Sequence, residues 1–282
     1  MALFSLLVVL LLERLKLIAP ALQFNAVFDA YRSRLFNDSE LRSGWKMLFS
    51  LALAPSLVAL LAYEFEGVHY GVWHLALWLL VGVVLFSHME LRAAFKEYLE
   101  AACRADLQAS FHIADKVDPV PLEAVTEREL GQRMGQVAAW LNYRYYAAVA
   151  LYFVLLGPAV ATFYCVVRGY HDHFERHQLN RPLVSGLMTL LDWVPVRLVA
   201  FGFALSGHFS RALSVWLSLA FKPTVSARTL IYRVALVAEE IPVETAAPVC
   251  VQSTLNLLKL AKRNVTLLLI LVSLLTIFGV LS

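Results

Sequence analysis

The sequence predicts an all-α polytopic membrane protein with about four or five membrane helices. Of its 282 residues, 60% are hydrophobic and only 16% are charged, and the mean hydropathy of +0.67 lies well above the values typical of soluble domains. Several runs reach the length of about 20 apolar residues that a helix needs to cross the hydrocarbon core. No stretch of useful length alternates with a period of two, so no sheet is predicted.

Four runs are long enough to cross a membrane. Three of them are apolar almost throughout: residues 45–63, 68–86 and 265–282. The fourth run, residues 138–167, is long enough to cross even with a break at Gly157 and Pro158. Arg144 lies near its start, where a long side chain can carry its charge to the membrane surface.

The N-terminal run "MALFSLLVVLLLERLKL" is shorter. Its charges follow the apolar stretch and no small-residue cleavage site occurs, so we expect it to belong to the mature protein. It crosses the bilayer only if Glu13 and Arg14 are buried against protein, which makes both residues candidates for an internal site. The alternative is an interfacial anchor whose charged end lies among the lipid headgroups.

Lys and Arg counts in the short flanks predict the orientation. The loop "EFEG" after the first clear span has two acids and no base, whereas four bases precede that span: Arg32, Arg34, Arg42 and Lys46. Residues up to about 44 are therefore expected in the cytoplasm, the chain returns there at His88, and the C-terminus points outward. Within a single integral domain, 1–282, residues 88–137 form a cytoplasmic helical insert and residues 208–263 a second polar helical region.

The insert has a readable helical pattern. A helix predicted within residues 88–111 pairs Glu100 with Arg104 and has an apolar face that comprises Phe95, Leu99, Ala102 and Leu107. Prolines at positions 119 and 121 end this helix, and residues 126–129 ("TERE") fit a capping box that opens the next one.

The segment "LLDWVPVRLVAFGFAL", residues 190–205, combines an acid, a proline and a base in an apolar run. Proline is favoured at the first position of a helix, so a helix is predicted from Pro195 to about Ser206, with Gly207 as its stop. Twelve residues span about 18 Å, too short for a core of about 30 Å, which predicts a broken or re-entrant helix within residues 187–206.

Charge placement in this predicted helix suggests a binding site. Arg197 in a first turn would lie beside free N–H groups, and together they would form a cradle for a phosphate or carboxylate. Asp192 would then bind an amine, a hydroxyl or a divalent cation. The alternative is a local pair of Asp192 with Arg197 that only fixes the break.

Other patterns exclude several classes of site. The cysteines Cys103, Cys165 and Cys250 lie far apart, so neither a disulfide nor a thiolate metal site is predicted. In "HDHFERH", His173 and His177 are four residues apart and are weak candidates for zinc ligands; overall, no metal and no cofactor is predicted. No nucleotide-binding or serine-hydrolase motif occurs, and a net charge of +3 spread along the loops predicts no nucleic-acid partner.

Two motifs carry a family resemblance. "LLGPAVATFYCVVRGY" followed by "LDWVPVRL" resembles the membrane family typified by the cobalamin biosynthesis proteins CobD and CbiB. The chain is more similar to one branch, the AmpE family of β-lactamase regulatory inner-membrane proteins. That similarity covers essentially the full length and includes "LLERL", "YLEAACRAD", "WLNYRYY", "LDWVPVRL" with "ALSGH", and the short apolar C-terminal span.

The AmpE resemblance implies a sensory or signalling protein of the bacterial inner membrane, linked to anhydro-muropeptide recycling and to β-lactamase regulation. Its expected partners are the lipid bilayer, an anionic metabolite such as a muropeptide or lipid phosphate, and a cytoplasmic protein or a second copy. The candidate ligand-binding residues are Asp192, Arg197, Asn142, Arg144, Arg168, Glu13 and Arg14.

An enzymatic role is not favoured but stays an alternative. The cobalamin branch implies a transferase or ligase that joins a phosphorylated amine to a carboxylate, yet its G-D-P, E-N-x-x-D and N-T-L-D motifs do not occur here. A small-molecule carrier is the further alternative, because broken helices at membrane depth also suit transport.

Overall fold

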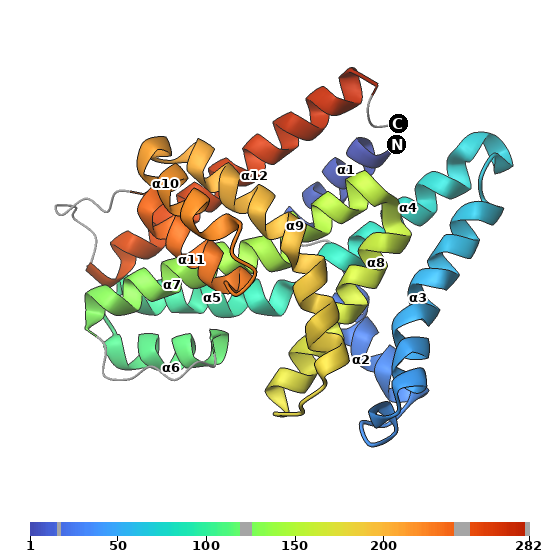
Figure 1. Cartoon of the computed structure of the whole chain (residues 1–282), viewed down its shortest axis with the longest axis horizontal. Helices are drawn as coiled ribbons and strands as arrows, with labels where there is room; N and C mark the ends of the chain where they lie inside the picture. The colour runs from blue at the N-terminus through green and yellow to red at the C-terminus, as the bar shows by residue number, and fades with distance from the viewer. Residues whose placement is uncertain (16–17, 119–125, 240–248, 280–282) are drawn as a thin grey trace. The chain divides into compact units, whose positions relative to one another are not determined.

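The computed structural model describes residues 1–15, 18–118, 126–239 and 249–279, and within them it contains helices and no strand (Figure 1). The predicted all-α class is confirmed. In the described part of the chain, five helical segments are long and apolar enough to cross a membrane: Gly44–Glu64, Val72–Cys103, Glu127–Arg176, Pro182–Ser206 and Val251–Ile277. The chain is therefore a multi-pass membrane protein whose environment is the lipid bilayer.

The chain divides into two compact units. The first unit comprises Met1–His88, Ala148–Asp192 and Leu271–Ser282, and the second comprises Met89–Ala147 and Trp193–Ile270. Helices α9 (Pro182–Ser206) and α12 (Val249–Ile277) contribute residues to both units. Helix α12 joins the end of the predicted polar helical region, residues 208–263, to the described part of the C-terminal span without a break.

The first unit is a helical bundle. Its other helices are α1 (Ala2–Arg14), α2 (Phe24–Leu35), α3 (Gly44–Glu64), α4 (Val72–Phe86) and α8 (Ala148–Arg176), with short turns η1 (Pro20–Leu22), η2 (Glu40–Arg42) and η3 (Val68–Gly71). Helix α3 packs on α8, and α1 packs on both α4 and α8. Because the helices cover one another in this way, polar side chains on α8 can be shielded from lipid.

Helix α1 runs beside α4 in the same direction. Met1 lies at Gly71, before the start of α4, and Val9 packs so closely on Gly82 that a Cβ added there would lie 2.7 Å from Val9 Cγ2. Leu6 and Val9 are buried by this packing. At the far end of α1, Glu13 is buried and Arg14 is exposed, so the burial that the sequence analysis required for crossing holds for the acid alone.

Helix α8 is interrupted at Gly157. The φ of 86° and ψ of 175° at this residue lie outside the helical region, in a conformation that glycine adopts without steric cost. Pro158 follows at once, and its fixed φ suits the first position of the second half. The predicted break is therefore present, and Figure 1 shows α8 changing direction within its length.

Helix α9 differs from the prediction. It begins at Pro182, not at Pro195, and continues for 25 residues to Ser206. At 1.5 Å per residue this length is about 38 Å, enough to cross the hydrocarbon core. The expected break within residues 187–206 is thus wrong, whereas the predicted end at Ser206 is confirmed. The preference of proline for the first helical position is satisfied by Pro182, and Pro195 lies in the interior.

The second unit contains α5 (Met89–Cys103), α6 (Leu107–Val117), α7 (Glu127–Asn142), the π-helical turn η4 (Tyr143–Ala147), α10 (Phe209–Ala220) and α11 (Ala227–Ala238). Helix α5 packs on α6, and α11 packs on both α7 and α10. A hydrophobic core joins α5, α6, α7 and α12; its buried residues are Tyr98, Ala102, Ala114, Leu130, Met134 and Val251.

The insert departs from its prediction at one point. The helix expected within 88–111 is two helices, because Ala105 adopts a φ of 57° and Asp106 caps α6 by accepting a hydrogen bond from the Ala109 N–H at 3.0 Å. Glu100 consequently pairs with Lys96 at 3.0 Å, and the predicted pair with Arg104 is wrong. The capping box at residues 126–129 is confirmed, and the prolines at 119 and 121 lie outside the described residues.

A buried carboxylate ties three segments of the second unit together. Asp118, just after α6, accepts a hydrogen bond from Arg228 Nη2 of α11 at 2.6 Å. Its other oxygen lies 3.6 Å from Arg133 Nη2 of α7. Burial alone would lower the pKa of Arg228, but the hydrogen bonds and charge interactions with Asp118 and Tyr232 together outweigh burial, and the pKa lies above its usual value. Asp118 is thus the ionic centre of this part of the fold.

Candidate functional site

Pro195, inside α9, leaves one backbone carbonyl without its helical donor, and α8 supplies a replacement. Because Pro195 has no N–H, the carbonyl of Leu191, four residues earlier, loses its helical donor. The hydroxyl of Tyr152, on the first half of α8, donates to this carbonyl at 2.7 Å. At membrane depth such a carbonyl must find a partner within the protein. Tyr152 therefore compensates for the proline.

Replacing Tyr152 with phenylalanine is expected to lower the free energy of unfolding by about 1–3 kcal/mol, since it leaves the Leu191 carbonyl without a donor. Thermal unfolding in mild detergent measures the loss. In a Pro195→Ala background the helical N–H returns, so the same substitution should cost markedly less. An equal cost in both backgrounds would show that Tyr152 does not act through this carbonyl.

Asp192 lies one residue further along α9 and is buried, with 4% of its surface exposed. The hydroxyl of Tyr164, on the second half of α8, donates to Asp192 Oδ1 at 3.0 Å. The rings of Tyr152 and Tyr164 stack with centroids 5.0 Å apart. Two tyrosines from the two sides of the Gly157 break thus bind successive residues of α9.

Arg168 lies one helical turn beyond Tyr164 on α8 and is fully buried. Its Nη2 is 3.2 Å from Nε2 of His88, and its guanidinium lies 4.9 Å from the centre of the Phe24 ring. Because a guanidinium can only donate, His88 Nε2 accepts in this contact and carries no proton there. We call His88, Tyr164, Arg168 and Asp192 the buried polar cluster.

The free-energy cost of placing ionisable side chains in membrane segments makes the buried polar cluster a candidate site. Tyr164 and Arg168 lie in one candidate membrane span, and His88 and Asp192 lie in two others. Ionisable side chains are rare in such segments because removing them from water is expensive, and those that occur commonly mark functional sites. Tyr164 and Arg168 point to the same face of α8, since they are four residues apart.

Arg197 does not lie in a first turn, so the anion cradle predicted at the start of a helix is not formed there. Its Nη1 donates to the Trp193 carbonyl at 2.6 Å, its Nε donates to the Ala220 carbonyl at the end of α10, and its guanidinium lies 4.2 Å from the Trp193 ring centre. A cation is favourable at the C-terminal end of a helix, where free carbonyls carry partial negative charge. Arg197 therefore joins α9 to α10.

The remaining predicted site residues divide between the two units. The first unit holds Glu13 and Arg14 together with Arg168 and Asp192, and the second unit holds Asn142 and Arg144 together with Arg197. Arg144 is buried in the π-helical turn, 5.4 Å from the centre of the Trp140 ring. Asn142 is partly buried, and its Oδ1 has no hydrogen-bond partner among the described residues.

The sequence did not reveal two members of the buried polar cluster, His88 and Tyr164, nor Tyr152, which binds the neighbouring Leu191 carbonyl. For Tyr152 a signal was available, because a proline inside a membrane helix requires a donor for the carbonyl four residues earlier. Which tyrosine supplies that donor depends on tertiary packing.

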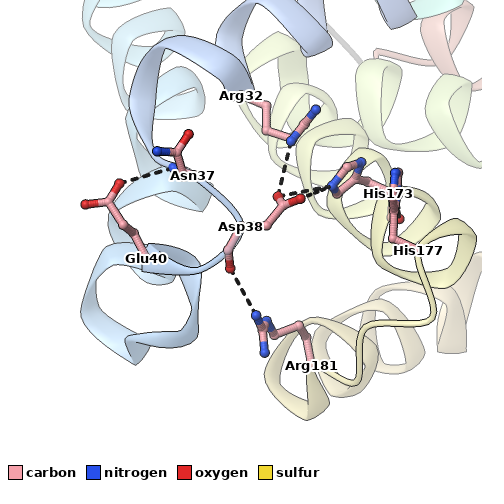
Figure 2. Close-up of polar contacts among 7 residues, drawn as sticks. All are labelled: Arg32, Asn37, Asp38, Glu40, His173, His177 and Arg181. Atoms are coloured by element: carbon pink, nitrogen blue, oxygen red, sulfur yellow. Dashed lines mark hydrogen bonds and ion pairs between the residues drawn. The ribbon is translucent and has the colours of Figure 1, made fainter.

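A second polar cluster surrounds Asp38, in the turn between α2 and α3 (Figure 2). The Asp38 carboxylate accepts from Arg32 Nη1 at 3.1 Å and from His173 Nε2, which lies 3.1 Å from each carboxylate oxygen. Arg181 Nη2 donates to the Asp38 carbonyl at 3.0 Å. These contacts hold the turn after α2 and the segment between α8 and α9 at the same end of the first unit.

The Asp38 cluster also engages the histidines predicted as weak zinc candidates. His173 Nε2 is occupied by Asp38, and His177 Nδ1 lies 2.9 Å from the His173 carbonyl. Positive charges from Arg32 and Arg181 lie beside Asp38 and oppose a cation there. In the described part of the chain, a metal-compatible spacing instead groups His171, Asp172 and Glu175.

The Asp38 cluster predicts a loss of stability in acid. Burial alone would raise the pKa of the Asp38 carboxyl, but the hydrogen bond and charge of His173, with Arg32 and His177, lower it below the usual value. A lowered carboxyl pKa adds stability above the unfolded value of about 3.9, and this stability is lost as the pH falls through the folded value.

We therefore expect the melting temperature of the wild type to fall as the pH is lowered from about 5 towards 3. An Asp38→Asn variant should show a shallower fall over the same range. Parallel curves for the two proteins would contradict a stabilising role for the Asp38 charge.

Comparison with known proteins gives matches over the whole chain. The family model described as "Regulatory signalling modulator protein AmpE" matches residues 1–282. A protein of Shigella flexneri named "Protein AmpE" is 29% identical over 293 aligned residues, which cover 100% of both chains. No solved structure matches the chain.

Proposed function

The chain belongs to the AmpE family of regulatory signalling modulators, and on this premise we propose that it is an inner-membrane protein that links cell-wall recycling to β-lactamase expression. The full-length family match is the observation that carries the proposal, because every membrane segment described above falls within it. The signal that we propose the protein senses is the pool of anhydro-muropeptides that recycling produces.

The buried polar cluster is the element that we propose reads the signal. A signalling membrane protein needs a group whose interactions differ between two states, and buried charges supply such differences because their energies depend strongly on small changes in contact. Asp192 and Arg168 carry opposite charges and are bound through Tyr164 and His88, respectively. A displacement of α8 relative to α9 would change the first contact, and a displacement relative to His88 would change the second.

The ligand class follows from the permanent positive charge of Arg168. An anionic metabolite, either a muropeptide or a lipid phosphate, would be attracted to a guanidinium held in surroundings of low polarity. The expected anion site is therefore the buried polar cluster and not Arg197, whose donors bind helix carbonyls. Native mass spectrometry of the purified chain beside an Arg168→Gln variant tests it. An anionic adduct on the wild type alone supports the ligand, and equal adducts on both proteins refute it.

Regulation itself is tested in a bacterial host that has an inducible chromosomal β-lactamase and lacks its own member of the family. We expect expression of the chain to change the induced β-lactamase level relative to an empty vector, in response to added anhydro-muropeptide. The same level in both strains, with the chain present in the membrane fraction, would refute the proposed function.

A further inference from the structure

Helix α10 has an exposed apolar stripe. Phe209, Leu213 and Leu217 recur every four residues along it, and Phe221 follows its last residue. Phe209 is 46% exposed, Leu217 is 52% exposed and Phe221 is 75% exposed. Leu213 is partly exposed between them. Contiguous exposed apolar surface of this kind marks an interaction site.

The other sides of α10 have different partners. One side packs on α11, and the buried residues of α10 are Ala212, Leu219 and Ala220. By helical periodicity, the side opposite these buried residues is polar, and its residues are exposed: Ser210, Arg211, Ser214 and Ser218. A helix that met protein on one side and only water elsewhere would be polar on every other side. The apolar stripe between these two sides therefore needs an apolar partner.

The stripe continues an apolar surface of α9. Val194, Leu198 and Leu205 are exposed along the second-unit part of α9, within a segment able to cross the membrane, and such side chains contact lipid. Helix α9 ends at Ser206, and α10 starts three residues later at Phe209. The chain thus passes from a lipid-facing helix directly into the stripe.

Charge at the two ends of α10 fits a membrane surface. Arg211 lies in the first turn and Lys222 follows the helix, and both are exposed. Helices that lie in the membrane interface combine an apolar side with basic residues that reach the lipid phosphates. Among the exposed residues of α10 itself, from Phe209 to Ala220, none is acidic.

Two contacts fix α10 to α9. The Nε of Arg197 donates to the Ala220 carbonyl at the end of α10, and the indole N–H of Trp216 donates to the Arg197 carbonyl at 3.0 Å. The Trp216 ring also lies 5.1 Å from the Phe201 ring, measured between centroids. Arg197 is therefore a positioning residue that sets the direction in which the stripe faces.

We propose that α10 is an interfacial helix, with Phe209, Leu213 and Leu217 inserted into the bilayer surface and its basic residues at the lipid phosphates. This role is separate from the regulatory function and does not depend on it. Part of the predicted second polar helical region, residues 208–263, would then lie within the membrane interface.

The test uses the full chain in nanodiscs of phosphatidylethanolamine and phosphatidylglycerol, in a background where Cys103, Cys165 and Cys250 are replaced. A fluorescent maleimide is attached to Leu217→Cys or, as the matched neighbour, to Ser218→Cys. Lipids with brominated acyl chains quench fluorophores in the bilayer, and iodide quenches those in water. We expect the label at 217 to lose most of its fluorescence with brominated lipid, and the label at 218 to respond to iodide.

Adding Arg197→Ala should reduce lipid quenching at position 217, whereas Arg233→Ala, an exposed arginine of α11, should leave it unchanged. Equal iodide quenching at 217 and 218 would overturn the proposal, because α10 would then lie in water. Protection of position 217 from both quenchers would also overturn it, since the stripe would then be covered by protein, such as a second copy of the chain.

Discussion

Replacing Asp118 with alanine should destabilise the second unit by about 1.5–3 kcal/mol, as for the loss of hydrogen bonds to charged groups, because the two arginines left without their partner stay partly exposed. The carboxylate is buried and holds Arg228 at 2.6 Å and Arg133 at 3.6 Å. These arginines come from α11 and α7, so the substitution removes the ionic link between both helices and the end of α6. Neither arginine can lose its charge to relieve the cost.

Hydrogen exchange of the intact chain in detergent measures this loss. If amides of α6, α7 and α11 exchange through opening of the unit, a loss of about 1.5–3 kcal/mol corresponds to roughly ten- to a hundredfold faster exchange. Asp115→Ala, which removes an exposed acid one turn earlier on α6, is the matched control and should change little. Equal exchange in both variants would show that Asp118 is not the centre of the link.

Composition and the lengths of apolar runs were enough to predict the fold class and four of the five membrane segments found in the described residues, because hydrophobic length depends on local sequence alone. The fifth segment was missed at Pro195. Two prolines in this region satisfy the rule for a helix start. The helix begins at Pro182 and continues through Pro195, where the Tyr152 hydroxyl binds the carbonyl that Pro195 frees. A contact between residues 39 positions apart leaves no periodic signal.

The insert shows a different kind of error. Its apolar periodicity continues through residue 107, and the prediction followed that pattern past Asp106, a residue type that commonly caps helices. In the structure Asp106 caps α6, and the chain turns at Ala105. The local cap signal was present in the sequence and should have outweighed the periodic one.

For the site, the sequence predicted charged residues but not their partners. Asp192 was a candidate because it is a charged residue in an apolar run, and Arg168 was a candidate because it lies in a motif that carries the family resemblance. Their contacts with Tyr164 and His88 come from residues 28 and 80 positions away. Likewise, the spacing of His173 and His177 suggested a shared metal, whereas His173 binds Asp38, 135 positions away.

Replacing Asp192 with asparagine should abolish regulation while leaving the fold nearly intact. Asparagine has the same shape, and its Oδ1 can still accept the hydrogen bond from Tyr164, so little packing or bonding is lost. What disappears is the negative charge, buried at 4% exposure in a membrane segment. If the buried polar cluster reads the signal, this change removes the response; if Asp192 only anchors α9, the response survives.

A complementary variant separates charge from bonding. Tyr164→Phe keeps the Asp192 charge but removes the hydroxyl that donates to it at 3.0 Å. The cost should be about 1.5–3 kcal/mol, as for hydrogen bonds to charged groups. A lowered melting temperature with retained regulation would assign Tyr164 to stability and leave Asp192 as the charge that regulation needs.

The most direct test of the central claim is the induced β-lactamase level in the host lacking its own family member, measured for wild type, Asp192→Asn and Asp29→Asn. Asp29 is an exposed acid of α2 and makes the same chemical change at a surface position. The three proteins are compared at equal amounts in the membrane fraction, and their melting temperatures are measured in detergent. If the buried polar cluster reads the signal, we expect the empty-vector level for Asp192→Asn and the wild-type level for Asp29→Asn. A wild-type response from Asp192→Asn would contradict this role of the cluster.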